Sequence, residues 1–496
     1  MSVLSDLEPK SVFTFFEEIT KIPHGSGNVE QISDYLADFA KERKLFCIQD
    51  EWKNVIIVKE ASAGYEEEPA IILQGHMDMV AVKKPDCEID MRTEGLRAAV
   101  KGDVVYAEGT SLGGDDGIAV AYCLALLDSH TIKHPKLEVI LTVDEEVGMD
   151  GARAIDLSML TGNRMVNLDS EDEGIFLTSC AGGARVKCRL PLVSEEGEGI
   201  AFKVTVGGLL GGHSGGEIHK ERGNSNCLLG RLLQRVSRQI PVRLCEAKGG
   251  LADNAIPRET SALLVLEKKD GDTFQEILAG LEKEIQTELA TKDPGFYIRA
   301  EAAGEGACPD SAADGGKRYR CVSAADTKKA ADFLTALPNG VQAMSADMPG
   351  LVETSLNMGI LEYVDGSGLL AEFSVRSSVE SSKHALIDRL RAVTELAGGS
   401  NEVTGDYPGW TYRKDSPLRD KMVALYEKMY GTTPKVEAIH AGLECGIIGA
   451  NCPGLDMISF GPTLRSPHSP DERAFIPSVS KFYNFLTATL EQTPEE

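Results

Sequence analysis

The strongest constraint on the fold is a short apolar segment that ends in a histidine and a carboxylate. Residues 71–80 read IILQGHMDMV, so three apolar residues run toward a glycine that precedes His76 and Asp78. This pattern predicts a buried strand that ends at a loop. Residues two apart share a face of an extended chain, so Asp78 could hydrogen-bond His76 and leave its second ring nitrogen for a metal. For an isolated pair, a hydrogen-bonded histidine at a strand end would be the better interpretation, and the metal site therefore depends on further ligands.

Further carboxylates follow apolar strands or begin an apolar helix. They are Asp115 in the glycine-rich start of a helix over 118–127, Glu145 and Glu146 after a strand over 137–143, and Asp169 after a strand over 165–168. In open α/β sheets, the carboxyl ends of the strands form the edge where ligands bind. A second histidine, His468, lies in a proline-rich loop near the end of the chain. The pattern indicates an α/β sheet with a metal site at one edge.

Five side chains are candidate metal ligands: His76, Asp115, Glu146, Asp169 and His468. Nitrogen and oxygen donors without a thiolate favour zinc, with manganese or cobalt also suitable. Five ligands are too many for one open tetrahedral zinc, but they fit two metals if one carboxylate bridges. Two divalent cations, three carboxylates and a bridging hydroxide are together neutral, which suits a sheltered site. Such a pair could share a hydroxide that attacks a peptide carbonyl, as in dinuclear aminopeptidases.

Two more residues have the chemistry that hydrolysis needs. Glu145 adjoins the candidate ligand Glu146 but should face another way, which makes it the candidate general base and then acid. His213 lies in a glycine-dense loop over 207–216 and is the candidate donor to the developing oxyanion. As an isolated feature, each would be an ordinary charged or polar loop residue.

Length and composition limit the class of protein. A chain of 496 residues with 42% apolar and 26% charged residues predicts a globular protein with two or more domains. A net charge of −26 argues against nucleic acid and anionic membranes as partners. We expect no membrane span and no secretory signal, because no long apolar run is present. The eleven cysteines never form C-x-x-C, which favours reduced thiols and a cytoplasmic location.

Local patterns predict individual elements outside the site. An amphipathic helix is expected over 28–45, with Asn28 as its cap. A hairpin is expected with arms over 356–364 and 369–375 and a turn near Asp365 and Gly366. The sequence pattern changes after residues 182–183. Buried apolar strands give way to strands in which apolar and polar residues alternate, with helices between them, and the α/β pattern returns from about residue 398. These changes favour an α+β domain inserted into an α/β domain.

Eight motifs carry a resemblance to a known family. In chain order they are GHMD at 75–78, GDDG at 114–117, DEEVGMDGA at 144–152, LDSE at 168–171, GGHSG at 211–215, NAIP at 254–257, HAGLECG at 440–446 and PHSPDE at 467–472. Each is weak alone, but the ordered set is specific and spans the chain. The sequence resembles the dinuclear zinc peptidase family of aminoacylase and carboxypeptidase G2, and within it the bacterial dipeptidases.

The resemblance implies a role for each candidate ligand. Asp115 would bridge the two metals, His76 and Asp169 would complete one site, and Glu146 and His468 would complete the other. Asp78 would orient His76, and Glu145 would be the catalytic base. The family also implies a cis peptide bond between Asp115 and Asp116.

The resemblance also implies an architecture. A sheet-based catalytic domain flanked by helices, over 1–183 and 394–496, would be interrupted by an α+β lid over 184–393. His213 and Asn254 would reach the site from the lid, and Arg376 would grip the substrate carboxylate, although a surface salt bridge would also explain this arginine. His440 is either a further site residue or a hydrogen-bonded histidine at a strand end. A homodimer is expected.

The expected function is that of a metal-dependent dipeptidase. It would act on dipeptides with a free amino terminus, aminoacyl-histidine among them, through a hydroxide that bridges two metals. The alternatives are an N-acyl amino acid hydrolase or carboxypeptidase with the same site, and a non-catalytic relative that binds peptides or metal.

Overall fold

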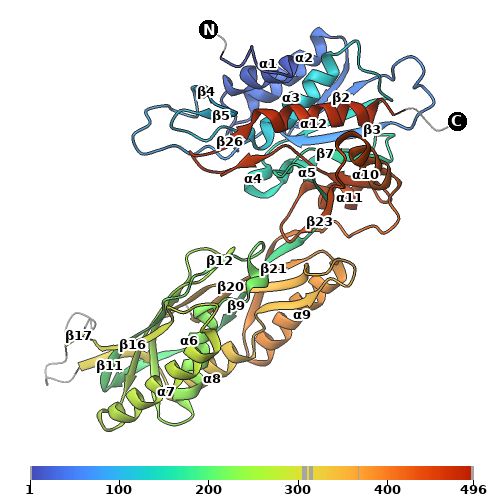
Figure 1. Cartoon of the computed structure of the whole chain (residues 1–496). Helices are drawn as coiled ribbons and strands as arrows, with labels where there is room; N and C mark the ends of the chain where they lie inside the picture. Colours follow the sequence, from blue (N-terminus) through green and yellow to red (C-terminus); the bar gives the residue numbers. More distant parts are fainter. Residues whose placement is uncertain (1–2, 304–309, 312–316, 367, 493–496) are drawn as a thin grey trace. The chain divides into compact units, whose positions relative to one another are not determined.

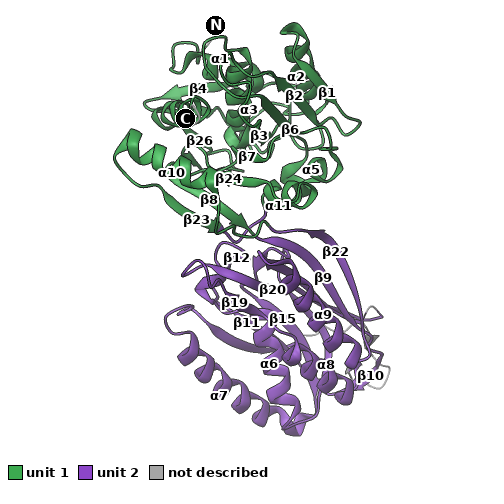
Figure 2. Cartoon of the chain, turned by 90° about the vertical axis from the view of Figure 1, so that its right-hand side faces the viewer, with its two compact units in different colours: residues 1–180, 410–438, 443–496 green, residues 181–409, 439–442 purple. Residues whose placement is uncertain are grey.

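The chain divides into two compact units in the computed structural model, which describes residues 3–303, 310–311, 317–366 and 368–492. Unit 1 comprises Met1–Cys180, Trp410–Ala438 and Leu443–Glu496, and unit 2 comprises Ala181–Gly409 and Ile439–Gly442 (Figure 2). Within the described ranges, no helix has the length and apolar content needed to cross a membrane.

Unit 1 is built on an eight-stranded sheet. In pairing order its strands are β1 (Phe46–Gln49), β2 (Val55–Lys59), β6 (Leu137–Thr142), β3 (Ile71–His76), β7 (Arg164–Asn167), β24 (Asp456–Ser459), β8 (Ile175–Cys180) and β23 (Lys435–Ile439). The four central strands, β6, β3, β7 and β24, run parallel. Their carboxyl ends therefore meet at one edge of the sheet.

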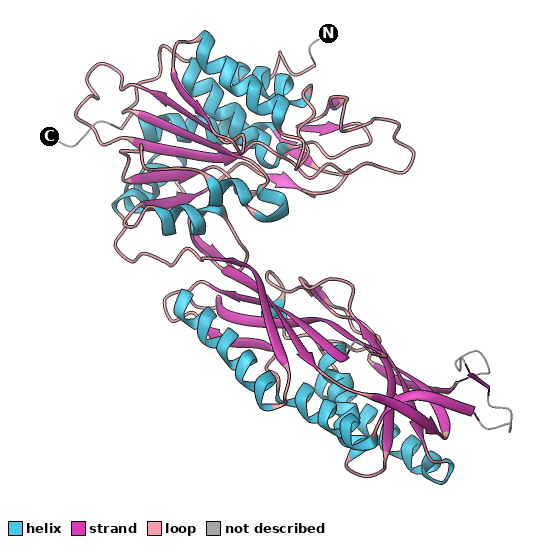
Figure 3. Cartoon of the chain, turned by 180° about the vertical axis from the view of Figure 1, so that it is seen from behind, coloured by secondary structure: helices cyan, strands magenta, loops and turns pink. Residues whose placement is uncertain are grey.

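Helices cover both faces of this sheet (Figure 3). One face shares a core with α1 (Lys10–Thr20), α2 (Glu30–Glu42), α3 (Gly114–Asp128), α10 (Pro417–Tyr430) and α12 (Ile476–Leu490), labelled in Figure 1. The opposite face packs against α11 (Glu444–Asn451), beside which lie the short helices α4 (Glu145–Gly148) and α5 (Asp150–Ala154). Alternate residues of β2 and β6 belong to the two cores, because successive side chains of a strand point to opposite faces. A small antiparallel sheet completes the unit with β4 (Ala98–Lys101), β5 (Val104–Ala107), β26 (Arg473–Phe475) and β25 (Leu464–Arg465).

Unit 2 is built on a long antiparallel sheet. In pairing order its strands are β16 (Tyr297–Ala302), β11 (Ile200–Gly207), β15 (Thr260–Leu266), β13 (Val242–Gly249), β20 (Val352–Val364), β21 (Gly368–Ser377), β9 (Gly182–Leu190) and β22 (Ser400–Tyr407), with β19 (Gly340–Met344) also on β20. The predicted hairpin is confirmed as β20 and β21.

The two faces of this sheet are covered differently. One face shares a core with α6 (Ser225–Ser237), α7 (Gly271–Leu289), α8 (Ala324–Ala336) and α9 (Glu380–Leu396). A small sheet of β10 (Ser194–Glu198), β18 (Lys317–Val322) and β17 (Asp310–Ser311) packs on β13 and β15 through a separate cluster. The remaining short elements are β12 (Gly212–His213), β14 (Ala255–Ile256) and the single 3₁₀ turns η1 (Ile218–Lys220) and η2 (Lys268–Asp270).

The expected α/β fold with an inserted α+β part is confirmed, but the boundaries of the units differ from the predicted ones. Residues 394–409, assigned from sequence to the catalytic domain, lie in unit 2 because β22 pairs with β9 along the edge of the long sheet. Residues 181–183 also join unit 2, because β9 begins at Gly182. The segment 439–442 belongs to unit 2 as well.

The predicted helix cap at Asn28 is wrong. The helix α2 begins at Glu30, and its flanking residue is Val29, which makes no side-chain capping bond. The side-chain amide of Asn28 instead donates to the backbone carbonyl of Arg92 at 3.1 Å. A long-range hydrogen bond has therefore replaced the local one that the sequence pattern favoured.

Candidate metal centre

The five predicted ligands occupy the ends of elements in unit 1. His76 is the last residue of β3, Glu146 lies in α4 directly after β6, and Asp169 follows β7. Asp115 lies at the start of α3, where its backbone departs from helical geometry, and the Asp115–Asp116 peptide bond is cis as the resemblance implied. His468 lies in the loop between β25 and β26. The parallel strand ends therefore deliver most of the set to one edge of the sheet.

Distances place these side chains around a common point. One oxygen of Asp115, Oδ1, lies 3.3 Å from Nε2 of His76, and the other, Oδ2, lies 3.1 Å from Nε2 of His468. His468 Nε2 is also 2.8 Å from Oε1 of Glu146. Asp169 Oδ1 lies 4.0 Å from His76 Nε2. Asp115 thus stands between two groups of donors, one containing His76 and Asp169 and the other containing Glu146 and His468.

The imidazole of His76 is held with a defined nitrogen toward this point. It is 1% exposed, and its Nδ1 donates to the backbone carbonyl of Asp78 at 3.0 Å. The Asp78 carboxylate lies slightly farther from Nδ1, at 3.5 Å. A proton on Nδ1 leaves the lone pair on Nε2, which faces Asp115 and Asp169. The backbone carbonyl therefore shares the orienting role that the sequence analysis gave to the carboxylate alone.

Asp78 has a second task that the sequence did not indicate. Its carboxylate accepts from the backbone amide of Glu145 at 3.1 Å and from the Ser26 hydroxyl at 2.8 Å. Burial would raise the pKa of Asp78, but hydrogen bonding and charge from His76, with these donors, lower it below its usual value. The same ionised carboxylate thus positions the histidine and the start of α4.

Glu472 fixes the start of α3, and sequence reasoning gave it no role. Its carboxylate accepts four backbone N–H groups: from Leu112 at 2.7 Å, Gly113 at 3.0 Å, Gly114 at 2.8 Å and Asp115 at 3.2 Å. These are the donors that a helix N-terminus leaves without partners. Glu472 lies within the PHSPDE motif, but the sequence carries no sign of a partner 357 residues away.

Asp116 is a further buried carboxylate that the sequence analysis did not single out. Its Oδ2 accepts from the backbone amide of His76 at 3.2 Å. Burial, followed by repulsion from Asp169, raises its pKa well above the usual value. It adds to the concentration of acidic groups around His76.

The electrostatics of the centre fit divalent cations. Burial, with repulsion from Asp115 and Glu146, raises the pKa of Asp169 to about 7. The Asp115 and Glu146 carboxylates raise the pKa of His468 to about 11. Glu146 Oε1 is buried and makes no hydrogen bond, although it lies close to His468 Nε2. A carboxylate oxygen and an imidazole nitrogen that face each other at 2.8 Å, in a field that favours positive charge, suit a common cation that would replace the proton on the ring.

The general-base candidate lies beside these ligands. Glu145, Glu146 and His76 offer donor atoms within 4.8 Å of one another. Burial is the main cause of a pKa well above the usual value for Glu145, and Asp169 and Glu444 add to it. The carboxyl of Glu145 is therefore disposed to hold a proton near the reacting groups.

Four predicted site residues lie in unit 2. His213 and Asn254 are neighbours there, because β12 pairs with β14 and the Ser214 amide donates to the Asn254 carbonyl at 2.8 Å. His213 Nδ1 accepts from the Gly216 amide at 3.0 Å, which places the proton of the neutral ring on Nε2. Burial and the charge of Arg376 lower the pKa of His213. The ring is thereby kept as a neutral hydrogen-bond donor.

Arg376 and His440 lie against the same loop of unit 2. A side chain at Gly215 would come within 2.4 Å of the His440 carbonyl and 3.3 Å of Arg376 Nε. The Nε of Arg376 is buried without a hydrogen-bond partner. His440 is 7% exposed, its Nε2 is 2.7 Å from the Ser355 hydroxyl, and its Nδ1 has no partner. The fold of unit 2 therefore brings Arg376 and His440 to the loop that carries His213, and their roles in the reaction stay predictions.

A second cluster of side chains that could bind a metal lies in unit 2, but a lysine already balances its negative charge. Glu380, His384 and Asp406 offer donor atoms within 4.8 Å of one another. The fully buried Lys383 ammonium lies 2.9 Å from Glu380 and 2.6 Å from Asp406. This positive charge takes the place of a cation, so the group is an ion-pair cluster.

Comparisons with known proteins agree with this geometry. The sequence model described as "Peptidase family M20/M25/M40" matches residues 72–492. The chain is 36% identical over 496 residues to the "Cytosol non-specific dipeptidase" of Escherichia coli K12, covering 100% of both chains.

Solved structures show the same fold. The "Aminoacylhistidine Dipeptidase from Vibrio alginolyticus" matches with a TM-score of 0.90 and 37% identity, over 100% of this chain and 99% of that chain. The "aminopeptidase PepT from Bacillus cereus" matches with a TM-score of 0.54 and 14% identity, over 98% of each chain, which shows a likeness of fold alone.

Proposed function

The chain belongs to peptidase family M20/M25/M40, and from that premise we propose that it is a metal-dependent dipeptidase acting on dipeptides with a free amino terminus. One observation carries this proposal: His76, Asp115, Glu146, Asp169 and His468 converge in unit 1. The names of the relatives from Escherichia coli and Vibrio alginolyticus support dipeptides as the substrates.

The centre would hold two divalent cations, with zinc as the first choice and manganese or cobalt as alternatives. Asp115 would bridge them, because its two oxygens face the two histidines. When bound, such a pair supplies positive charge that activates water near neutral pH and polarises the peptide carbonyl. His76 with Asp169, and Glu146 with His468, would complete the two sites.

Glu145 would move the protons of the reaction. Its carboxylate would accept a proton from the attacking water and deliver it to the leaving amine. Its backbone is held by Asp78, and its donor atoms lie beside His76 and Glu146, which supports this role. Burial, together with the surrounding carboxylates, raises the pKa of Glu145 and favours its protonated form, as the second of the two transfers requires.

Residues of unit 2 would bind and orient the substrate. His213 presents a neutral Nε2–H, which suits donation to an oxyanion. Arg376 has a buried Nε without a partner, and the planar fork of this side chain suits a substrate carboxylate. Asn254 beside His213, and His440 beside Arg376, would complete the binding surface.

The cellular location and the partners of the protein are part of the same proposal. We place it in the cytoplasm, because its relative from Escherichia coli is named a cytosol dipeptidase and the ten cysteines within the described residues form no disulfide. A homodimer is proposed from the family resemblance, and small peptides are the expected partners, without nucleic acid or membrane.

A peptide panel tests the proposal. Dipeptides, tripeptides and N-acetylated dipeptides are assayed with the metal-loaded protein and again with chelator. Rapid metal-dependent cleavage of free dipeptides alone is the expected result. Preference for the N-acetylated compounds would assign the site to an N-acyl amino acid hydrolase, and no turnover with any loaded metal would leave a binding protein.

A further inference from the structure

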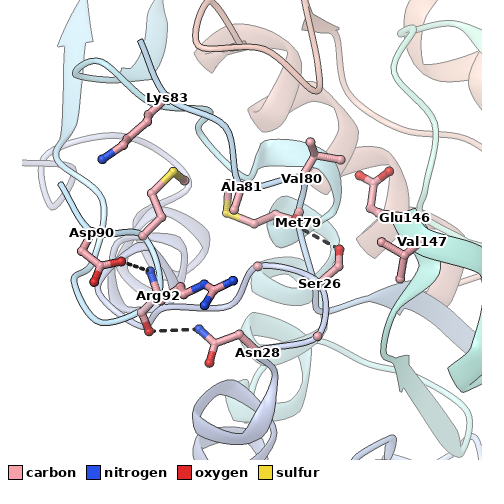
Figure 4. Close-up of a pocket in the computed structure, with 13 residues that line it drawn as sticks. Ser26, Asn28, Met79, Val80, Ala81, Lys83, Asp90, Arg92, Glu146 and Val147 are labelled. Atoms are coloured by element: carbon pink, nitrogen blue, oxygen red, sulfur yellow. Dashed lines mark hydrogen bonds between the residues drawn. The ribbon is translucent and has the colours of Figure 1, made fainter. Parts of the chain in front are cut away.

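A cavity of about 810 Å³ borders the candidate metal centre in unit 1, and none of the roles above uses it. Glu146 and Val147 form part of its wall, and Lys83, Asp90 and Arg92 lie on another side (Figure 4). Because Glu146 is a proposed ligand, a substrate group that fills this cavity would lie next to the reacting bond.

Part of the wall between these two sides is apolar. Met79, Val80 and Ala81 lie shortly after β3 and line the cavity together with Met91, while Ser26 and Asn28 add polar groups. Val147 is 67% exposed, so its side chain offers apolar surface to an incoming group. A short aliphatic stem could be covered by these side chains.

The far end of the cavity carries unpaired positive charge. The guanidinium of Arg92 points into the open space in Figure 4 and has no hydrogen bond or ion pair with any residue that the structure describes. The ammonium of Lys83 donates to the backbone carbonyl of Ile89 at 2.7 Å and, among the described side chains, to no carboxylate. The Asp90 carboxylate lies on the same side of the cavity but is bonded to the backbone, so the two cations at this end form no ion pair among the described residues, which is unexpected in a chain with a net charge of −26.

The loop that carries Arg92 is held in place by its backbone. The Asp90 carboxylate accepts from the Arg92 amide at 3.1 Å, and Asn28 donates to the Arg92 carbonyl at 3.1 Å. The Asp90 amide donates to Glu94 at 3.0 Å. Asp90 therefore stabilises the turn, and the backbone from which the Arg92 side chain extends toward the cavity is held in place.

We propose that this cavity selects substrates with an acidic side chain and that Arg92 is the residue that determines this specificity. The inference rests on the proposed dipeptidase function and deepens it. The methylenes of glutamate or aspartate would lie along the apolar wall, and the side-chain carboxylate would meet the guanidinium of Arg92, with Lys83 adding positive charge. The terminal carboxylate of the peptide is a second source of the same chemistry, and the test distinguishes the two.

Matched peptides that differ only in side-chain charge test the specificity. The values of kcat/KM are measured for Glu–Ala against Gln–Ala and for Ala–Glu against Ala–Gln. The wild type should favour glutamate at one of the two positions, and Arg92→Gln should reduce that ratio about three- to tenfold, mainly through KM. Arg97→Gln, which removes an exposed arginine outside the cavity wall, should leave the ratio unchanged.

Two kinetic outcomes would overturn the proposal. An unchanged glutamate-to-glutamine ratio in Arg92→Gln would show that the guanidinium does not contact the side chain. An equal loss for all four peptides would assign the contact to the terminal carboxylate instead.

A binding measurement separates this inference from the proposed function. Calorimetry compares L-glutamate with L-glutamine on the wild type, on Arg92→Gln and on Arg97→Gln, and needs no turnover. Tighter binding of glutamate that is lost only in Arg92→Gln supports the cavity assignment even if no peptide is cleaved, in which case the dipeptidase proposal alone fails. Equal binding of the two amino acids by the wild type contradicts the cavity assignment.

Discussion

Asp115 reaches both histidines of the candidate centre, one with each carboxylate oxygen, at 3.3 and 3.1 Å. Glu145 lies close by but has a different environment, because its backbone is fixed by Asp78. The proposed roles of ligand and base are thus assigned to neighbouring carboxylates that have different contacts.

Replacing Glu145 by glutamine should separate chemistry from metal binding. The amide cannot take a proton from water, so kcat should fall by at least about 10²-fold, the usual scale for general acid–base catalysis. The five proposed ligands are untouched, so metal content by mass spectrometry should equal that of the wild type. A Glu145→Gln enzyme with near-normal kcat would exclude this residue as the base.

His440 should make unit 2 less stable in acid. Burial, with the charges of Arg376, His213 and His219, lowers the pKa of His440 to about 3 from its usual 6.5. Between these values the unfolded chain binds a proton that the folded chain does not, so stability should fall as the pH is lowered from 6.5 toward 3. Denaturant unfolding at pH 7.5 and pH 5 measures this loss, and NMR should show a neutral ring at pH 5.

A matched variant checks that assignment. His440→Gln keeps a polar side chain near Ser355 and removes the titrating group. Its stability should decline less between pH 7.5 and pH 5 than that of the wild type. If both proteins lose the same stability, other groups cause the acid sensitivity.

At the scale of elements, the start of α3 depends on a partner from another part of the chain. Glu472 accepts four amides there, and Gly113 turns the chain with a φ of 67°. A glutamine at 472 would present N–H groups to at least two of those amides. We expect a loss of about 2–4 kcal/mol of stability and weaker metal affinity, because buried donors would lack acceptors.

Calorimetric unfolding of the metal-free protein, together with metal titration, measures both effects of Glu472→Gln. Asp471→Asn is the control, because the neighbouring carboxylate is exposed and pairs with Lys84 at 3.1 Å. It should cost less than about 1 kcal/mol. Equal effects of the two substitutions would mean that Glu472 does not position α3.

The elements that carry the site are those that local sequence could predict. Strands β3 and β6 are mostly apolar and buried along their whole length; β3 ends in His76, and Glu145 and Glu146 follow shortly after β6. Three sets of hydrogen bonds between distant residues were not predicted. The Glu472 carboxylate accepts from amides at the start of α3, the Asp78 carboxylate accepts from the Glu145 amide, and the Asn28 side chain donates to the Arg92 carbonyl. Local patterns cannot indicate hydrogen bonds between residues far apart in the chain.

At the scale of the whole chain, the order of the motifs is more informative than any single motif. Ligands from 76 to 468 lie in one unit, although unit 2 interrupts that unit in sequence. The unit boundaries were harder to predict than the ligands, because β22 is an edge strand whose pairing with β9 leaves little trace in local composition.

Metal removal should abolish activity reversibly. Dialysis against a chelator should reduce dipeptide turnover to background, since the carboxylates and imidazoles alone supply no activated water. Returning zinc, manganese or cobalt should restore it, and the relative rates would identify suitable metals. Full turnover after complete removal of metal would contradict the proposed mechanism.

The number of metal ions bound per chain decides whether the five side chains form a dinuclear centre. Mass spectrometry of the loaded protein, with anomalous diffraction to locate the ions, should find two, one beside His76 and Asp169 and the other beside Glu146 and His468. Asp115→Asn should lose both or bind them far more weakly. A single ion per chain, or an ion pair placed away from Asp115, would contradict the account.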